Sequence, residues 1–169
     1  MAAVSVREYE ERDRDACREL WAELTQHHRD IYDDQTLGGD DPRRWFDTYL
    51  EEQKPARVWV AELDGRVVGF VGALSVHGGQ RYELEPIVVA AETRSRGIGS
   101  ALAQTLVDAA RDAGLRGVEV RPAARNSAAI RFFHRQGFDV LGQLELVLDL
   151  TGRDRWRPGE RLAGSDFRV

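Results

Sequence analysis

The sequence has almost no cysteine, no excess of positive charge and no long apolar run, and each absence excludes a class of protein. One cysteine among 169 residues, Cys17, excludes an internal disulfide framework and a cysteine-based zinc cluster. No window approaches the ~20 apolar residues that span a bilayer, so we expect no membrane segment and no membrane partner. A formal net charge of −5 argues against a general nucleic-acid binder, which needs a basic surface to displace counterions.

The N-terminal segment and the histidines exclude two further classes. Residues 1–15 lack the apolar stretch of a secretory signal, and we therefore expect a cytoplasmic protein. His27 and His28 are adjacent on a predicted helix, face different directions and lack a partner one turn away, so we expect no metal. Cys17 stands among helix-forming residues, where a small buried apolar role is expected of it.

Composition and pattern place the chain in the α/β class. It is 42% hydrophobic and 31% charged, as globular proteins are, and 169 residues suffice for one self-supporting core. Strand and helix patterns alternate without an internal repeat, which favours one mixed layer structure. We predict a single domain over residues 1–150. Residues 151–169 lose all periodicity and are predicted to form a C-terminal tail that wraps over the domain or over a partner subunit.

The apolar periodicity predicts the order of strands and helices. The dipeptide Asp64-Gly65 tolerates the positive φ of a tight turn and predicts a hairpin between strands 57–63 and 66–74. Apolar residues at helical spacing, followed by Gly114, predict a long helix over residues 97–113. The other predicted strands are residues 4–9, 82–89, 117–120 and 141–150, and the other predicted helices are residues 13–32, 43–52 and 126–136.

The stretch ETRSRGIGSAL, residues 92–102, lies where a predicted strand ends and the long helix begins. The unpaired N–H groups and the dipole of a helix make an anion site at such a junction. Gly97 and Gly99 leave the amides uncovered, and Arg94 and Arg96 can add charge-assisted hydrogen bonds. The pattern indicates a phosphate site, although glycines that only turn the chain, beside solvated arginines, would need no ligand.

Two common phosphate-binding patterns fit this stretch poorly. A dinucleotide fingerprint would need a third glycine where Leu102 stands, and the Gly-Lys-Ser/Thr ending of an ATPase phosphate loop is absent. An α/β nucleotide binder unrelated to acyl transfer remains as a third alternative, which protection by ATP or a dinucleotide would support.

The pattern Arg94-x-x-Gly97-x-Gly99 after the residues IVV resembles the R/Q-x-x-G-x-G/A signature of the GNAT superfamily, the acyl-coenzyme A-dependent N-acetyltransferases. The resemblance extends over about residues 57–150 and includes Asn126 followed by AAIRFFHRQGF. It implies a central, mostly antiparallel twisted sheet flanked by helices, with strands four and five splayed. It also implies transfer of an acetyl group from acetyl-coenzyme A to a primary amine of a small molecule or peptide, by direct attack in a ternary complex.

The resemblance also implies where the coenzyme lies. The amides from about Arg96 to Ser100 would hold the pyrophosphate, and the strand around Val88 and Val89 would pair with pantetheine. Asn126 has an alternative role as a helix N-cap. The full set of predicted coenzyme residues is Ile87, Val88, Val89, Arg94, Ser95, Arg96, Gly97, Ile98, Gly99, Ser100, Asn126 and Phe133.

Amine acetylation needs a group that takes a proton, because an alkylamine holds its proton to a pKa of about 10. Glu83 and Glu85 lie two apart on a predicted strand and share a face, so burial or mutual repulsion can raise the pKa of one. The resemblance implies a carboxylate on this strand as general base, acting directly or through water. We prefer Glu83 slightly; the alternative is a pair of solvent-facing glutamates. A backbone N–H near Val89 is the predicted donor to the oxyanion.

One departure from the family pattern concerns the leaving thiolate. Where the family often has a tyrosine to protonate it, the sequence has Phe133. His134 is rotated by about 100° from that position on the helix, and Tyr82 or water are other donors. A thiol with a pKa of about 8.5 can also leave without an acid. The alternative function is an acyl-coenzyme A-binding sensor or scaffold with little turnover.

An acidic segment between the first two predicted helices bears on the acceptor. Members of the resembled family commonly shape the acceptor pocket there, and negative charge would attract a cationic amine. Aromatic residues of this region either line that pocket or pack the two helices together, and exposed strand edges with the tail make a homodimer an expectation. The aspartates are Asp30, Asp33, Asp34, Asp40 and Asp41, and the aromatic residues are Trp21, Tyr32, Trp45 and Phe46.

Overall fold

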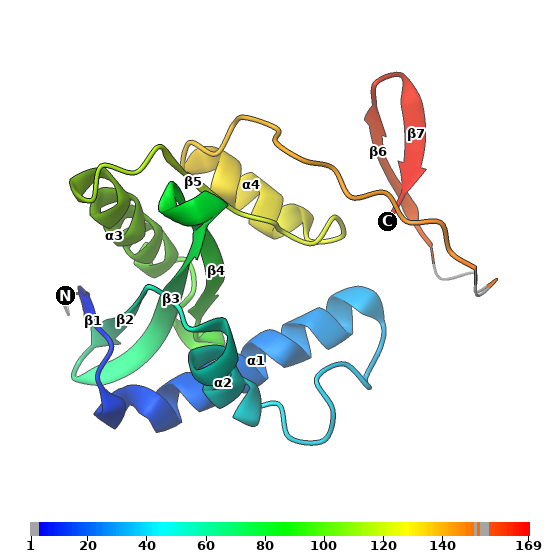
Figure 1. Ribbon diagram of the computed structural model, residues 1–169. Helices are drawn as coiled ribbons and strands as arrows, with labels where there is room; N and C mark the ends of the chain where they lie inside the picture. Colours follow the sequence, from blue (N-terminus) through cyan, green and yellow to red (C-terminus); the bar gives the residue numbers. More distant parts are fainter. Residues whose placement is uncertain (1–3, 151, 153–155) are drawn as a thin grey trace. The chain divides into compact units, whose positions relative to one another are not determined.

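The computed structural model describes residues 4–150, 152 and 156–169, and the chain forms two compact units, Met1–Val120 and Arg121–Val169 (Figure 1). The single domain expected over residues 1–150 stays a prediction. Within the described ranges, no helix has both the length and the apolar character needed to cross a membrane.

The first unit contains the strands and helices that the periodicity predicts, in the predicted order. Short 3-10 or π-helical turns join several of them, including the π-helical turn Tyr49–Gln53 after α2. The strands are β1 (Ser5–Glu8), β2 (Arg57–Leu63), β3 (Arg66–Val76), β4 (Arg81–Val89) and β5 (Gly117–Glu119), and the helices are α1 (Arg14–Tyr32), α2 (Arg44–Thr48) and α3 (Ile98–Asp112).

The five strands form one sheet in sequence order, β1-β2-β3-β4-β5. Strands β1 to β4 are antiparallel to their neighbours, and β4 pairs with β5 in parallel. The predicted mixed α/β fold with a mostly antiparallel sheet is therefore confirmed. The parallel pairing covers only Arg81–Glu83 against Gly117–Glu119, so β4 continues for the rest of its length without β5 beside it.

Helices cover both faces of this sheet. Consecutive residues of a strand point to opposite faces, so neighbouring residues of β3 contact different helices. On β3, a Cβ at Gly69 would touch the Leu102 side chain of α3, whereas the next residue, Phe70, lies under Trp21 of α1 with ring centroids 6.1 Å apart. Helix α3 thus covers one face, and α1 and α2 cover the other (Figure 1). Phe70 and Leu102 are fully buried at the centre of the two layers.

Strand β4 carries a bulge at Glu85-Pro86. Between the pairs Val71↔Ile87 and Ala73↔Leu84, β4 has one residue more than β3, and Gly72 lies opposite the extra residue. The hydroxyl of Tyr49 donates a hydrogen bond of 2.7 Å to the Glu85 carbonyl at this point. A side chain on Gly72 would collide with that hydroxyl and with the Glu85 carbonyl, so only glycine fits beside the bulge.

The second unit differs from what the periodicity predicts. It contains α4 (Ser127–Arg135), as predicted, and an antiparallel hairpin of β6 (Pro158–Leu162) and β7 (Ser165–Arg168) inside the segment expected to be an irregular tail. The prediction of a strand over residues 141–150 is wrong, because those residues pair with no other strand of the described residues. Alternating leucines give a strand its faces, but a strand forms only where another backbone accepts its hydrogen bonds.

Candidate functional site

The junction of β4 and α3 presents a run of unpaired backbone amides. Helix α3 begins at Ile98, and its N-cap, Gly97, has a φ of +82°. The first amide of this region that returns to the helix is that of Ala101, which donates to the Gly97 carbonyl at 3.0 Å. The N–H groups of residues 95–100 find no acceptor among the described residues. We call residues 95–100 the amide loop.

The amide loop is exposed at Gly97 and is flanked by two arginines. A Cβ built on Gly97 would meet no atom of the described residues within 4 Å, so the space beside this residue is open. Arg94 and Arg96 are exposed beside it. Ile98 is buried, so only its backbone faces this site. Exposed amides at a helix N-terminus, flanked by guanidinium groups, suit a pyrophosphate.

A contact from α1 holds the segment that leads into the amide loop. The Glu23 carboxylate accepts a hydrogen bond of 3.0 Å from the backbone N–H of Ala91. The adjacent turn of α1 carries His27, whose pKa is lowered by burial and then by the charge of Arg94. Neither Glu23 nor His27 belongs to a recognisable sequence motif, and the sequence analysis did not identify Glu23. Its contact with Ala91 is evident only from the packing of α1 against the end of β4.

The C-terminal half of β4 has one edge with which no strand of the described residues pairs, and we call it the free edge. Its other edge pairs with β3, where the N–H of Ala90 donates to the Val68 carbonyl at 2.8 Å. Because successive N–H groups of a strand alternate between its edges, the N–H groups of Val89 and Ile87 point to the free edge. Arg94 donates its Nε–H to the Val89 carbonyl at 3.2 Å, which holds its guanidinium at this edge. The free edge can accept an extended ligand as a further strand would.

The two glutamates of β4 have different environments. Glu83 is buried, with 3% of its surface exposed, whereas Glu85 is exposed. Glu83 lies opposite Leu74, which is an even number of residues from Phe70, so both point to the α1 face of the sheet. Burial of a carboxyl disfavours its ionised form, and a general base works best when its pKa lies near the working pH, so a buried position suits this role better than an exposed one. The fold therefore distinguishes two glutamates that the sequence left nearly equal.

The remaining predicted residues belong to the second unit. Asn126 is the N-cap of α4, where its Oδ1 accepts a hydrogen bond of 3.0 Å from the Ala129 N–H. Phe133 is buried and lies edge-on to Phe132 and Phe138, with centroids 5.1 and 5.6 Å away. These contacts give both residues structural roles within their own unit.

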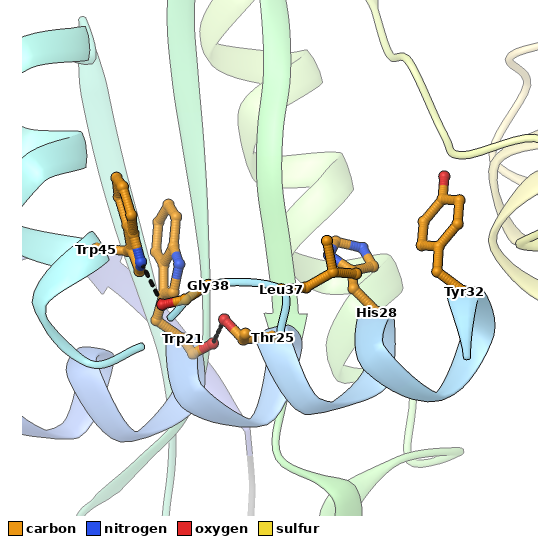
Figure 2. Close-up of a pocket in the computed structure, with 7 residues that line it drawn as sticks. All are labelled: Trp21, Thr25, His28, Tyr32, Leu37, Gly38 and Trp45. Atoms are coloured by element: carbon orange, nitrogen blue, oxygen red, sulfur yellow. Dashed lines mark hydrogen bonds between the residues drawn. The ribbon is translucent and has the colours of Figure 1, made fainter. Parts of the chain in front are cut away.

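Helix α1 also contributes to a cavity of about 400 Å³ (Figure 2), and three of the four aromatic residues that the sequence analysis named for a pocket or for packing, Trp21, Tyr32 and Trp45, line it. Four of its side chains come from one face of α1, at i, i+4, i+7 and i+11, and the others come from the connection to α2 and from α2 itself. We call it the aromatic cavity; its lining residues are Trp21, Thr25, His28, Tyr32, Leu37, Gly38 and Trp45.

The polar groups of the aromatic cavity are mostly in use. Trp45 donates its Nε1–H to the Gly38 carbonyl at 2.8 Å, and the Thr25 hydroxyl donates to the Trp21 carbonyl at 3.0 Å (Figure 2). Burial, and then the neighbouring His27, lower the pKa of His28 and so favour its neutral imidazole. A neutral imidazole offers one donor and one acceptor.

The aspartates of the acidic segment do not line this cavity. Asp34 accepts hydrogen bonds from the backbone and hydroxyl of Thr36, and Asp41 accepts one from the Arg43 N–H, so both organise turns. Gln26 donates to Asp30 one turn along α1.

Two other sequence predictions concern Cys17 and metal binding. Cys17 is fully buried, and burial raises its pKa to about 12, which keeps it a protonated thiol. In the part of the chain that the structure describes, no group of three or more histidine, cysteine, aspartate or glutamate residues comes together.

Comparison with known proteins relates this geometry to one family. The family model described as acetyltransferase (GNAT) family matches residues 14–138. A probable N-acetyltransferase camello of Xenopus tropicalis is 42% identical over 81 residues, which are 47% of this chain and 37% of that protein. The chain covers between 37% and 50% of the length of the first curated relatives it matches.

Other similar proteins match over nearly their whole length. The L-methionine sulfoximine/L-methionine sulfone acetyltransferase of Salmonella typhimurium is 28% identical over 158 residues, 88% of this chain and 91% of that protein. The solved structure of aminoglycoside N-acetyltransferase AAC(6')-Iy in complex with CoA superimposes with a TM-score of 0.65 at 15% identity, covering 89% of this chain and 97% of that one. At that identity the superposition shows a shared fold.

Proposed function

Since the chain belongs to the acetyltransferase (GNAT) family, we propose that it transfers an acetyl group from acetyl-coenzyme A to a primary amine of a small molecule or peptide. The attack is direct, within a ternary complex. The observation that carries the proposal is the amide loop, whose N–H groups have no acceptor among the described residues, beside the free edge of β4.

The amide loop and the free edge suit the two ends of the coenzyme. In this proposal the N–H groups of residues 95–100 bind the pyrophosphate, and Arg94 and Arg96 neutralise its charge. The Ile87 N–H, which points to the free edge of β4, pairs with a carbonyl of pantetheine, and the backbone of Val88 and Val89 lies along the pantetheine arm. No side chain of the first unit fills the space in front of Gly97, which supports this assignment.

The coenzyme supplies an activated thioester, and the residues of β4 control charge and protons around it. The Val89 N–H donates a hydrogen bond where negative charge develops on the acyl oxygen. Glu83 accepts the proton of the attacking amine, directly or through one water. Phe133 has no hydroxyl to give the departing thiolate a proton, so the thiolate leaves unprotonated or takes a proton from water or Tyr82.

The acceptor and the assembly state are further parts of the proposal. The relative from Salmonella typhimurium is named for two methionine derivatives and AAC(6')-Iy for aminoglycosides, and these names support an amine acceptor. The negative charge of residues 30–41 supports attraction of a positively charged amine. A homodimer in the cytoplasm remains our expectation from the sequence.

A second candidate function is an acyl-coenzyme A sensor or scaffold with little turnover, which the missing hydroxyl at Phe133 favours. Release of free thiol in the presence of an amine separates the two functions. Steady release above the rate without amine supports transfer, and coenzyme binding without release supports the sensor.

A thermal-shift titration with acetyl-coenzyme A, coenzyme A, ATP and NAD tests the coenzyme site. A ligand that binds only the native state raises the free energy of unfolding, by about 2.7 kcal/mol at 100 times its Kd. We expect stabilisation by the two coenzyme A compounds alone. Stabilisation by ATP or NAD instead would favour a nucleotide binder, and no shift with coenzyme A at saturation would contradict the proposed function.

A further inference from the structure

The aromatic cavity opens on the sheet face that carries Glu83. Trp21, at the base of the cavity, stacks on Phe70 of β3 with an interplanar angle of 17°. Phe70 is the register partner of Val88 in β4, so the cavity wall is one strand away from the free edge. Phe70 and the partner of Glu83, Leu74, point to this same face. A molecule bound in the cavity therefore lies on the side of the sheet where the candidate base lies.

The lining of the cavity is suited to an apolar group. Trp21, Tyr32 and Trp45 supply indole and phenol rings, and Leu37 adds an aliphatic side chain. No aspartate, glutamate, lysine or arginine is among the lining residues. The Tyr32 and Trp45 side chains are 36% and 38% exposed at the mouth of the cavity, and a flat ligand would cover part of both rings.

His28 is the polar group that the cavity offers to a ligand. Its ring makes no hydrogen bond to another described residue, whereas Trp45 and Thr25 already donate to backbone carbonyls. A neutral imidazole at this position can accept one hydrogen bond and donate one.

We propose that the acceptor is a primary monoamine that carries one aromatic or other flat apolar group, which the aromatic cavity binds between Trp21 and Trp45 with one hydrogen bond from His28. This inference rests on the proposed function, because it names the substrate class of the same site. A polyamine fits the cavity poorly. Each further ammonium group would lose hydration against the rings, and no carboxylate is among the lining residues to replace it.

The primary test compares acceptors and cavity variants by thiol release. We expect 2-phenylethylamine and tryptamine to exceed spermidine and putrescine in kcat/KM by about 100-fold or more. Trp45→Ala and His28→Ala should each raise the KM for 2-phenylethylamine about tenfold with kcat changed less, because they remove contacts made before the transition state. Trp45→Phe, which keeps a ring, should stay within about threefold of the natural chain.

A matched control removes a histidine outside the cavity. His77, in the turn between β3 and β4, is exposed and has a φ of +52°, a conformation that asparagine tolerates. His77→Asn should leave the KM for 2-phenylethylamine unchanged. Equal or better rates with spermidine or putrescine, or an unchanged KM in both Trp45→Ala and His28→Ala, would overturn the inference while leaving the proposed function in place.

A binding measurement keeps the two proposals distinguishable. Because Trp21 and Trp45 line the cavity, 2-phenylethylamine should change the intrinsic tryptophan fluorescence, and His28→Ala should weaken the apparent affinity about tenfold. If no amine is acetylated but this titration behaves as expected, the proposed function fails and the cavity assignment stands. If 2-phenylethylamine leaves the fluorescence unchanged at millimolar concentration, the cavity assignment is overturned.

Discussion

Glu83 and Glu85 stand two residues apart on one strand, yet the fold gives them different chemistry. The bulge at Glu85-Pro86 lies opposite Gly72, and Tyr49 holds the Glu85 carbonyl. Glu83 lies on the N-terminal side of the bulge, where the regular alternation of the strand directs its side chain to the face that α1 covers. Glu85 remains exposed. A carboxyl that must accept a proton near neutral pH needs the first environment and not the second.

Glu83→Gln should lower kcat about 100-fold, because an amide cannot accept the amine proton. The limb of the pH profile that reports a titrating carboxyl should disappear, while the thermal shift with acetyl-coenzyme A stays the same. Glu85→Gln should have a smaller effect than Glu83→Gln. Glu52→Gln, at an exposed position outside the site, is the control. A full rate in Glu83→Gln would contradict the assignment of the base.

Asp13 makes the stability of the fold depend on pH. It is 3% exposed and accepts two hydrogen bonds from the Arg7 guanidinium, at 2.7 and 2.8 Å. The hydrogen bonds from Arg7 are the largest cause that lowers the pKa of Asp13 from its ordinary value of 3.8. A carboxyl with a lowered pKa stabilises the native state above its ordinary pKa, and this contribution is lost as the pH falls through the native value.

Asp13→Asn should lower the free energy of unfolding by about 2–3 kcal/mol at pH 7, since it removes charged hydrogen bonds to a partly buried arginine. The difference from the natural chain should shrink as the pH falls below 3.8. Urea unfolding at pH 7 and pH 3 measures both effects. Asp108→Asn, which breaks an exposed pair with Arg111, should change stability by less than about 1 kcal/mol. Equal losses in the two variants would refute this account.

At the scale of the element, α3 has a left-handed glycine at each end. Gly97 before its first residue has a φ of +82°, and Gly114 after its last turn has a φ of +68°. Neither has another atom within 4 Å of the place where a Cβ would stand, so an alanine at either position meets conformational strain but no collision. The two positions differ in their sequence neighbours, since Gly97 is part of the amide loop and Gly114 is not.

Gly97→Ala and Gly114→Ala should each cost about 1–2 kcal/mol of stability, but only Gly97→Ala should weaken coenzyme A binding, by about tenfold. The reason is that the loop conformation at Gly97 aims the amides of residues 95–100 outward. Thermal unfolding with and without coenzyme A separates the two effects. If Gly97→Ala keeps its affinity for coenzyme A, the amide loop is not the pyrophosphate site.

At the scale of the whole molecule, the second unit exposes a run of aliphatic side chains. Leu144, Leu146, Leu148 and Leu150 are 59% to 87% exposed, on a segment that forms no ladder. Contiguous apolar surface of this kind marks an interaction site in soluble proteins. The expected homodimer would supply the cover that these side chains lack.

Light scattering should therefore give twice the mass of one chain, and hydrogen exchange should show protected amides over residues 141–150 in the dimer. Protection requires that these backbone groups pair, as the alternating leucines favour. Leu146→Asp with Leu148→Asp should reduce both the mass and the protection, because two charges would be buried at the contact. A monomer with unprotected amides in this segment would show the homodimer prediction to be wrong.

Features set by short stretches of chain could be predicted from the sequence. The Asp64-Gly65 hairpin, the start of α3 after the glycine-rich stretch and the end of α3 at Gly114 all depend on residues within one or two turns of each other. The unpaired amides of residues 95–100 follow from the same local rule, since a helix N-terminus leaves its first N–H groups without partners in the helix.

Features that need a distant partner were decided only by the tertiary structure. Burial of Glu83 depends on the sheet face that α1 covers, and the aromatic cavity joins residues of α1 to Trp45 of α2, which no periodicity relates. The strand expected at residues 141–150 fails for the converse reason, because alternation cannot supply the second backbone that a ladder requires. The sequence thus determined the elements of the first unit, helix α4 and the amide loop. Long-range packing determined which side chains share a site, since contact between distant segments is a property of the whole fold.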